Sequence, residues 1–529
     1  AAENRGGVLR DEDREALERQ QIFLAPHGMK QFHLEIQNLY AALAQPTEKL
    51  TVSYPVSDGK GAEKRPSFVI GRIARLLPSI SVETESADKE YRLSAKSTAL
   101  EYAGEHIGGA LWQYFEGQGD AERALAAMKD ASRYTRGHLS RDAVHALYGG
   151  AVTLSASRMD MARSCHFAYF MRYGLKARER TGAGFDAPQI GTFVHDVMEH
   201  TLRQAKECGG LHTLSKDKLH ALVRASIEEY IDRVLPDLCE KSARFRYLFN
   251  RLCAAVERIM DEVSEELQSS DFEPLAFELA FGADGQLPAI TIREENGTAR
   301  VVGKVDRVDG WLHDGKLYLR VVDYKTGKKS FDLAELRYGL GLQMLLYLFT
   351  LKEEGQMLFG GHEIVPAGVL YTPAREPMLR CARDTEPEKI EKALKKELRR
   401  SGMVLEDPAV LQAMEHSALE SPCYLPIAVK RDGAVTGSLA SAEQLGKLSK
   451  YVDHILHEIT QEVFAGNIDA DPYARTPQQS ACTYCEFASA CHFENGCGSD
   501  RMEYIKATKN DEFWQYIDEV NGEGAHENG

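Results

Sequence analysis

The alternation of apolar and polar residues predicts a regular order of elements between residues 190 and 371. Apolar side chains recur at helical spacing in residues 190–205, and residues 340–351 form a second, more apolar helix. Period-two alternation and β-branched residues predict strands at 274–281, 299–311, 316–324 and 364–371. The pair Asp314-Gly315 is typical of a tight turn between two of these strands. Helix, three strands, helix and strand is an α/β order, which predicts a mixed sheet flanked by helices.

The pattern outside this stretch divides the rest of the chain into further regions. Residues 1–75 contain two expected helices, at 11–21 and 30–43, and an expected strand at 49–54. Residues 76–150 are polar and helical in pattern, and we expect them to connect the first region to a large domain at 151–497. Residues 498–529 form an acidic tail, and we expect its extreme end to be disordered.

Composition narrows the class of protein. The 529 residues suffice for two to four domains, and 43% hydrophobic with 27% charged residues is typical of a globular protein. No apolar run is long enough to cross a bilayer, and no signal peptide is recognisable, so we expect no membrane partner and a cytoplasmic location. The first residues resemble the middle of a longer protein. A net charge of −16 argues against general coating of nucleic acid. This net charge is compatible with a local basic channel.

Two carboxylates and a lysine form the strongest chemical signal. Asp306 lies in the segment GKVDRVD and Asp323 in the segment VVDYKTG, on the two strands that the tight turn joins. Side chains alternate along a strand, so Asp323 and Lys325 share a face, and pairing of the two strands brings Asp306 beside Asp323. Two close carboxylates repel unless a cation lies between them, and hard oxygen ligands suit Mg²⁺ or Mn²⁺. Lys325 would then stabilise negative charge beside the metal.

The alternative is a hairpin with surface salt bridges, and we expect Arg307 and Asp309 to be only that. His195, on the helix before the strands, is a candidate for the metal's ligand set. Glu278 is an acidic residue in an otherwise apolar strand, which requires a partner such as the metal cluster. A half-exposed strand carboxylate is the competing interpretation for Glu278.

Four motifs together resemble a known family. The series GxxxH at 191–195, GxxDRxD at 303–309, DYKTGK at 323–328 and QxxxY at 343–347 is similar to the RecB-type branch of the PD-(D/E)xK nucleases. The resemblance implies a restriction-endonuclease-like core in which His195, Asp306 and Asp323 bind Mg²⁺ or Mn²⁺ and Lys325 assists the attacking water. It also places Gln343 and Tyr347 in a motif beside the site. Tyr347 alone is also compatible with a core position. Val305 replaces the proline that gives the superfamily its name.

Clustered cysteines near the C-terminal end predict a second metal centre. Cys482, Cys485 and Cys491 have the spacing of metal ligands but leave a centre one ligand short, and Cys165 is the candidate fourth. This set resembles the AddB-type nucleases and the CRISPR adaptation nucleases, which implies a [4Fe–4S] cluster that ties the two ends of the domain together. The alternative is a structural zinc site with Cys497 or His492 as its fourth ligand.

The first region resembles the end of a helicase domain. Residues 35–54 are similar to the last signature motif of superfamily 1 helicases, but Gln45 stands where that motif supplies an arginine to ATP. No GxxxxGK[ST] phosphate loop occurs in residues 1–75 either. The resemblance implies the end of a degenerate helicase-like domain, whereas an ordinary helix–strand unit would show the same pattern. Any ATP-driven motor must then lie elsewhere.

The chain combines a helicase-like first region with nuclease motifs and clustered cysteines. This combination resembles the C-terminal portion of the AddB-type nuclease subunits of bacterial AddAB helicase–nucleases. The resemblance implies a DNA exonuclease that acts with an AddA-type motor subunit as a heterodimer. It also implies resection of double-strand ends for recombinational repair, with the 5′-terminated strand cut in the nuclease site. The alternatives are a free-standing RecB-family or CRISPR-type nuclease, and a DNA-binding scaffold subunit without catalytic activity.

Overall fold

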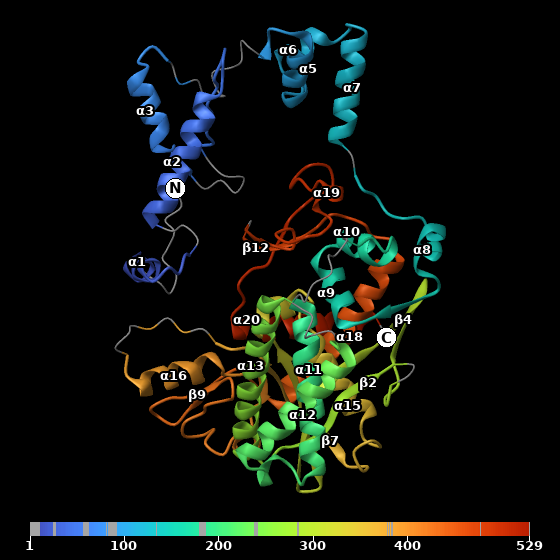
Figure 1. The fold of residues 1–529 in the computed structure, drawn as a ribbon. Coiled ribbons are helices and arrows are strands. Elements are labelled where there is room, and N and C mark those ends of the chain that lie inside the picture. The colour runs from blue at the N-terminus through green and yellow to red at the C-terminus, as the bar shows by residue number, and fades with distance from the viewer. Residues whose placement is uncertain are drawn as a thin grey trace. The chain divides into compact units, whose positions relative to one another are not determined.

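Two compact units, Ala1–Ala131 and Ser132–Gly529, divide the chain in the computed structural model (Figure 1). The structure describes residues 11–24, 28–56, 63–80, 82, 92–133, 135–178, 187–236, 242–282, 285–377, 379, 381, 385–476 and 478–527.

The described part of the first unit is helical. Its helices are α1 (Asp11–Arg19), α2 (Gly28–Ala44), α3 (Phe68–Leu76), α5 (Lys96–Glu105), α6 (Ala110–Phe115) and α7 (Asp120–Ser132). Trp112, Phe115 and Leu125 form a small core between α5, α6 and α7. Both expected helices are therefore present, but residues 49–54 form no strand. A strand requires a hydrogen-bonded partner, and none of the sheets in the described residues includes this segment.

A six-stranded mixed sheet forms the centre of the second unit. Its strands are β2 (Glu273–Phe281), β5 (Gly303–His313), β6 (Lys316–Lys325), β7 (Glu363–Pro373), β8 (Ser401–Leu405) and β11 (Leu439–Ala440). Their order across the sheet is β11-β8-β7-β6-β5-β2. The β6–β7 and β8–β11 pairs are parallel and the other pairs are antiparallel, so the predicted mixed sheet is confirmed.

The hairpin between β5 and β6 carries the acidic motif. Asp314 and Gly315 form its two-residue turn with positive φ angles of 48° and 77°, the conformation for which Asp-Gly is favoured. The single strand expected over residues 299–311 is wrong, because the chain changes sheet at Val302. The Val302 N–H donates to the Leu154 carbonyl at 2.9 Å, which draws the chain away from the central sheet.

A second, three-stranded sheet contains the first part of that expected strand. It has the order β1-β4-β3. Its strands are β1 (Ala151–Leu154), β3 (Ile290–Glu294) and β4 (Gly297–Val301). Strands β1 and β4 are parallel, whereas β3 and β4 are antiparallel.

Helices pack on the two sheets and on one another. They include α8 (Arg141–Tyr148), α9 (Ala156–Ser164), α10 (His166–Tyr169), α11 (Ala187–Glu207), α12 (Lys216–Val234), α13 (Ala243–Gln268), α14 (Leu333–Arg337), α15 (Gln343–Glu354), α16 (Pro387–Glu397), α17 (Pro408–Met414) and α18 (Ala442–Phe464). Helices α11, α12 and α13 lie side by side, and α15 packs against β6 and β7 (Figure 1). Arg203 and Lys206 of α11 donate to backbone carbonyls of the edge strand β2, which satisfies acceptors that would otherwise be open. The main hydrophobic core lies between these layers.

Short elements complete the second unit. They are a π-helical turn (Phe170–Gly174), a 3₁₀ turn (Leu211–Thr213), β9 (Ile427–Val429), β10 (Val435–Gly437), β12 (Tyr473–Thr476), β13 (Gln479–Ser480), α19 (Ala488–Cys491), β14 (Glu503–Tyr504) and α20 (Asn510–Glu527). Helix α20 packs against α18 and buries Phe513, Trp514 and Ile517. Most of the expected acidic tail is therefore ordered, because these apolar residues have a surface to cover. Residues 528 and 529 lie outside the described part of the chain.

Within the described residues, no helix has both the length and the apolar character needed to span a membrane.

Candidate active site

Asp306 and Asp323 meet where β5 and β6 leave the regular hairpin. The regular pairing of the two strands ends with Arg307 opposite Val322, and one step further along it places Asp306 opposite Asp323. The Tyr324 N–H donates to Asp306 Oδ2 at 2.8 Å and fixes that carboxylate. Lys325 Nζ lies 2.6 Å from Asp323 Oδ2, as the alternation of side chains along β6 predicts.

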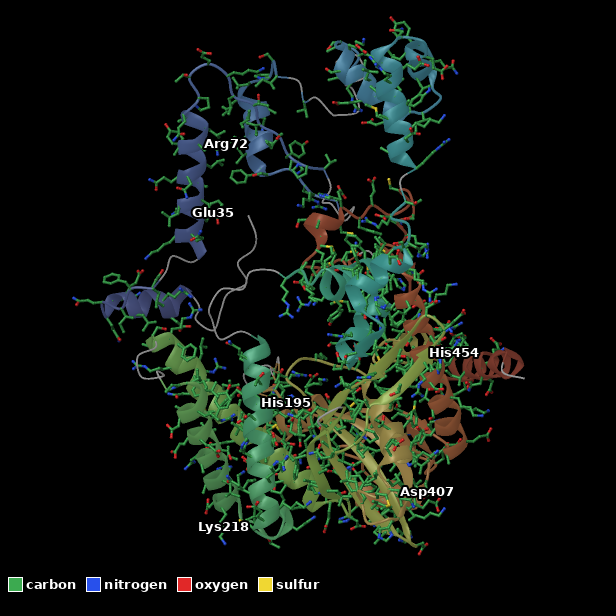
Figure 2. All side chains as sticks on the ribbon, turned by 90° about the vertical axis from the view of Figure 1, so that its right-hand side faces the viewer. Glu35, Arg72, His195, Lys218, Asp407 and His454 are labelled. Carbon is green, nitrogen blue, oxygen red and sulfur yellow. The ribbon has the colours of Figure 1, made fainter. Side chains whose placement is uncertain are left out.

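His195 extends toward this pair from α11. Figure 2 labels it on that helix. Its Nε2 lies 2.9 Å from the Tyr324 carbonyl, which can only accept a hydrogen bond, so Nε2 carries the proton. Nδ1 then faces Asp306 Oδ2 at 3.3 Å. A neutral ring in this tautomer presents the Nδ1 lone pair as a metal ligand.

Glu278 joins His195 and Asp306 in a candidate metal site. One ligand atom from each of the three residues lies within 4.8 Å of the others. Glu278 has a φ angle of 51° within β2, a left-handed conformation that non-glycine residues rarely adopt. It also forms an ion pair with Lys304. Such local strain in mid-strand is characteristic of functional sites, and here it places the Glu278 carboxylate beside the acidic pair.

The electrostatics of the site favour an added cation. Burial raises the pKa of Asp323, and the neighbouring charge of Asp306 raises it further. Asp323 is 3% exposed, and its Oδ2 has no hydrogen-bond donor of good geometry despite its ion pair with Lys325. Burial lowers the pKa of His195, but the hydrogen bond and charge of Asp306 outweigh it, so the net shift is upward. Carboxylate oxygens and one imidazole nitrogen gathered around two adjacent aspartates fit a hard divalent cation.

Gln343 and Tyr347 lie against the acidic pair from α15. Gln343 Nε2 donates to Asp323 Oδ1 at 3.4 Å and to the Tyr347 hydroxyl at 3.2 Å. The ring of Tyr347 is buried and packs edge-on against Phe281. A Cβ on Gly303 would lie 2.5 Å from both of these rings, so the glycine of the GxxDRxD motif permits the close packing.

All four predicted cluster ligands line one cavity of about 650 Å³. These residues are Cys165, Cys482, Cys485 and Cys491, and His492 lines the cavity as well, whereas Cys497 does not. Burial raises the pKa of Cys165 to about 12 and that of Cys482 to about 11, so the thiolate forms require a compensating cation.

Arg307 and Asp309 are not surface residues, contrary to expectation. Both are fully buried and belong to a buried ionic network formed by Arg307, Asp309, Arg320, Glu266 and Arg400. Arg320 Nε lies 2.9 Å from Asp309, and Arg400 Nη2 lies 2.6 Å from Glu266. The sequence contained a signal for this network, because Arg320 interrupts an apolar strand just as Glu278 does.

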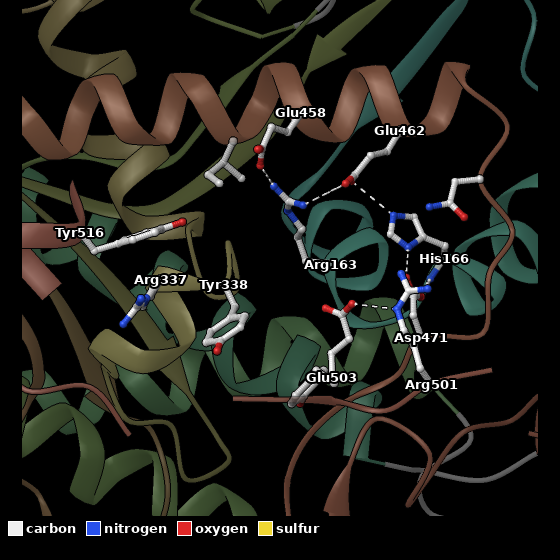
Figure 3. A pocket seen from close by; sticks show the side chains of 13 residues that line it. Arg163, His166, Arg337, Tyr338, Glu458, Glu462, Asp471, Arg501, Glu503 and Tyr516 are labelled. Carbon is white, nitrogen blue, oxygen red and sulfur yellow. Dashed lines mark hydrogen bonds and ion pairs between the residues drawn. The ribbon is translucent and has the colours of Figure 1, made fainter. Parts of the chain in front are cut away.

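A separate cavity of about 280 Å³ lies between α9, α10 and α18 (Figure 3). Most of its charged side chains form ion pairs within the protein. Arg163 pairs with Glu458 and Glu462, and His166 Nδ1 lies 2.6 Å from Asp471. Burial lowers the pKa of His166, but hydrogen bonds to Asp471 and Glu462 outweigh it and raise the pKa to about 9. These contacts hold the segment after α9 to α18 and to the chain that leads into the cysteine region.

The profile of the PD-(D/E)XK nuclease superfamily matches residues 153–492, which include both the acidic site and the four cysteines. This match decides the family. The chain belongs to the PD-(D/E)XK nuclease superfamily.

Relatives with longer chains extend the comparison. The chain is 30% identical to a subunit of the ATP-dependent helicase/deoxyribonuclease of Ruminiclostridium cellulolyticum, over 97% of this chain and 47% of that protein. It is 31% identical to the protein of the same name from Acetivibrio thermocellus, over 97% of this chain and 46% of that protein. The chain thus spans about half the length of the curated relatives that it matches.

Proposed function

We propose that this chain carries the nuclease of a bacterial helicase–nuclease and hydrolyses DNA phosphodiesters with Mg²⁺ or Mn²⁺. The observation that carries the proposal is the meeting of Asp306, Asp323 and Lys325 on neighbouring strands, with His195 beside them. The superfamily match over residues 153–492 supports the same chemistry.

Three residues would hold the metal: His195 through Nδ1, Asp306 and Asp323. Glu278 is close enough to His195 and Asp306 to add a further oxygen ligand or to accept a hydrogen bond from metal-bound water. A divalent cation bound here would polarise the phosphate and make its bound water more acidic.

Lys325 is placed to act on the reacting phosphate. Its ammonium group is paired with Asp323 and lies 5.7 Å from the centroid of the Tyr371 ring, so its position is restricted from two sides. From there it can orient the attacking water and stabilise the negative charge that accumulates in the phosphorane-like transition state. Gln343 would hold Asp323 in a ligating orientation through its hydrogen bond to Oδ1.

Replacement of one aspartate tests this assignment. Asp323→Asn should reduce cleavage of end-labelled single-stranded DNA with Mg²⁺ by about a thousandfold or more, because it removes a charged metal ligand. Asp314→Asn is the matched control, since Asp314 belongs to the same hairpin but lies in its exposed turn. Equal cleavage by both variants, with both folded, would overturn the assignment of the active site.

We further propose that Cys165, Cys482, Cys485 and Cys491 hold a [4Fe–4S] cluster. The four thiols line one cavity, and a cluster of this type is held by four cysteine thiolates. The lining of the cavity by Cys165 and not by Cys497 supports the early cysteine as the fourth ligand.

Metal analysis distinguishes the cluster from zinc. Protein purified without oxygen should be brown and contain about four iron atoms and four sulfides per chain. Cys485→Ser should remove the colour, whereas Cys497→Ser should keep it. Colourless protein with stoichiometric zinc, or loss of the metal in Cys497→Ser, would overturn the cluster and support the zinc alternative.

The proposed partner is an ATP-driven AddA-type motor, and the proposed substrate is a double-strand end in the bacterial cytoplasm. The longer relatives are named as subunits of an ATP-dependent helicase/deoxyribonuclease, which supports this assembly. In the proposed complex the 5′-terminated strand is cut during resection for recombinational repair, and residues 1–75 are the end of a degenerate helicase-like domain.

Strand-specific labels on a duplex, with the motor and ATP present, test the polarity. Asp323→Asn should protect the 5′-terminated strand, and protection of the other strand instead would reverse the proposal.

A further inference from the structure

A small recess beside the catalytic lysine is lined mainly by cations. It has a volume of about 190 Å³ and lies where β6 and β7 end and where α16 leads into β8. Six cationic side chains line this basic recess: Lys325, Lys328, Lys329, Arg375, Lys396 and Arg399. Glu397 is the one carboxylate among its described lining residues. This excess of positive charge contrasts with the net charge of −16 for the whole chain.

Several of these cations remain available to a ligand. Arg375 lies 3.4 Å from Glu397, and Lys329 lies 3.5 Å from Glu335. Within the described residues, no carboxylate lies within ion-pair distance of Lys328 or Lys396, and both side chains are exposed. Single exposed lysines are ordinary, but two unpaired lysines in a recess that already contains paired cations create a local positive potential.

The paired cavity of Figure 3 shows that such an excess is not a general property of this fold. That cavity also contains three arginines and a histidine, but it contains four carboxylates as well, from Glu458, Glu462, Asp471 and Glu503. Its charges therefore balance when His166 is protonated. The basic recess has no comparable set of carboxylates, so an external anion would have to balance its charge.

The position of the recess indicates which anion it would bind. Lys325 lines the recess and also pairs with Asp323, so the recess begins at the catalytic centre. Its volume is below the roughly 300 Å³ at which pockets for whole small molecules begin. Phosphate groups of a strand that lies across the site would fit this combination of size, charge and exposure better than a complete small ligand.

We propose that the basic recess binds the sugar–phosphate backbone of the DNA strand next to the phosphodiester that is cut. This inference rests on the proposed nuclease function and adds a substrate-positioning site to it. Contacts to phosphates position a strand without reading its sequence, which is what cleavage at successive nucleotides requires. Lys328 and Lys396 come from two separate segments, the loop after β6 and the end of α16, so contacts to both would hold the strand at two points beside Lys325.

Binding of single-stranded DNA tests the recess. The variant Lys328→Ala/Lys396→Ala should weaken binding of a fluorescent single strand by about tenfold at low salt. It should also reduce the slope of log Kd against log salt by about 1.4, because about 0.7 is lost for each single-strand phosphate contact. In steady-state cleavage the loss should fall on KM more than on kcat. The matched control is Lys352→Ala/Lys392→Ala, which removes the same charge from exposed positions on α15 and α16 outside the recess.

The outcomes separate this inference from the proposed catalysis. Affinity and salt slope equal to those of the control variant would overturn the basic recess, whether or not the protein cleaves DNA. A selective loss of affinity in an intact, folded chain that does not cleave DNA would instead support the recess and overturn the nuclease assignment. Binding measured in the Asp323→Asn background, in which the strand stays intact, gives the same comparison without cleavage.

Discussion

Strands β5 and β6 carry charged side chains on both of their faces, and the two faces differ in how that charge is balanced. On one face, Asp309 is fully buried and contacts two guanidinium groups, those of Arg307 and Arg320. On the other face, Asp323 is almost as buried but lies beside a second carboxylate, Asp306, which raises its pKa. Burial alone therefore does not mark a functional carboxylate. The useful criterion is the sign of the neighbouring charges: Asp309 lies between arginines, whereas Asp323 has a second carboxylate, Asp306, beside it as well as Lys325.

The two faces are connected through Tyr324. Its hydroxyl accepts a hydrogen bond from Arg307 at 2.7 Å on the face that carries Asp309. Its backbone N–H and carbonyl hold Asp306 and His195 on the opposite face. The buried ionic network therefore supports the residue whose backbone orients two of the proposed metal ligands.

The largest predicted difference is in stability. Asp309→Asn should lower the free energy of unfolding by about 3–5 kcal/mol, because it leaves three buried guanidinium groups, those of Arg307, Arg320 and Arg400, to share the single carboxylate of Glu266. Asp323→Asn should leave stability unchanged or raise it, because it removes a carboxylate whose ionisation is disfavoured by burial and by Asp306. Urea denaturation of both variants measures this. Similar losses in the two variants would show that the faces do not differ as described.

Acid should weaken the buried ionic network in a defined pH range. Burial disfavours ionisation of Glu266, but Arg400, Arg320 and Arg307 outweigh it and lower its pKa from 4.5 to about 2. A lowered pKa means that this contribution to stability is complete above about pH 4.5 and is lost as the pH falls toward 2. The stability difference between the parent and Glu266→Gln should therefore shrink across that range. A difference that stays constant from pH 5 to pH 2 would contradict this account.

The next largest predicted effect concerns the packing of side chains behind the acidic site. Gly303→Ala should reduce the cleavage rate by about a hundredfold, because the added Cβ overlaps the rings of Phe281 and Tyr347 and displaces the start of β5, which carries Asp306. Overpacking should also cost about 1–3 kcal/mol of stability. Single-turnover cleavage and thermal unfolding measure the two effects. Gly315 is unsuitable as a control because of its positive φ, whereas Gly446→Ala on α18, with no atom within 4 Å of the added Cβ, is suitable.

The smallest predicted effect concerns Gln343. Gln343→Ala should lower kcat by about tenfold, because Asp323 keeps its charge but loses the donor that orients Oδ1. Higher Mg²⁺ should recover part of the activity if the defect is in metal binding. Activity equal to that of the parent at all Mg²⁺ concentrations would leave Gln343 without a role in the site.

Much of the acidic site could be predicted from local sequence. Strand alternation places Asp323 and Lys325 on one face, and the Asp-Gly turn fixes the register that brings Asp306 beside them. The left-handed backbone at Glu278 could not be predicted in this way, because β propensity alone favours an ordinary strand there. The burial of Arg307 could not be predicted either, because its partner Glu266 comes from a helix that is distant in sequence.

Local pattern by itself determined the helices, the hairpin and the types of side chain available for metal chemistry, since these depend on neighbours a few residues apart. The tertiary structure alone decided how charges are paired, that Cys165 shares a cavity with the late cysteines, and that the lysines after β6 line one recess with Lys396 of α16. The physical reason is that electrostatic compensation depends on distance in space. Residues more than a hundred positions apart contribute to it as strongly as adjacent ones once the chain has folded.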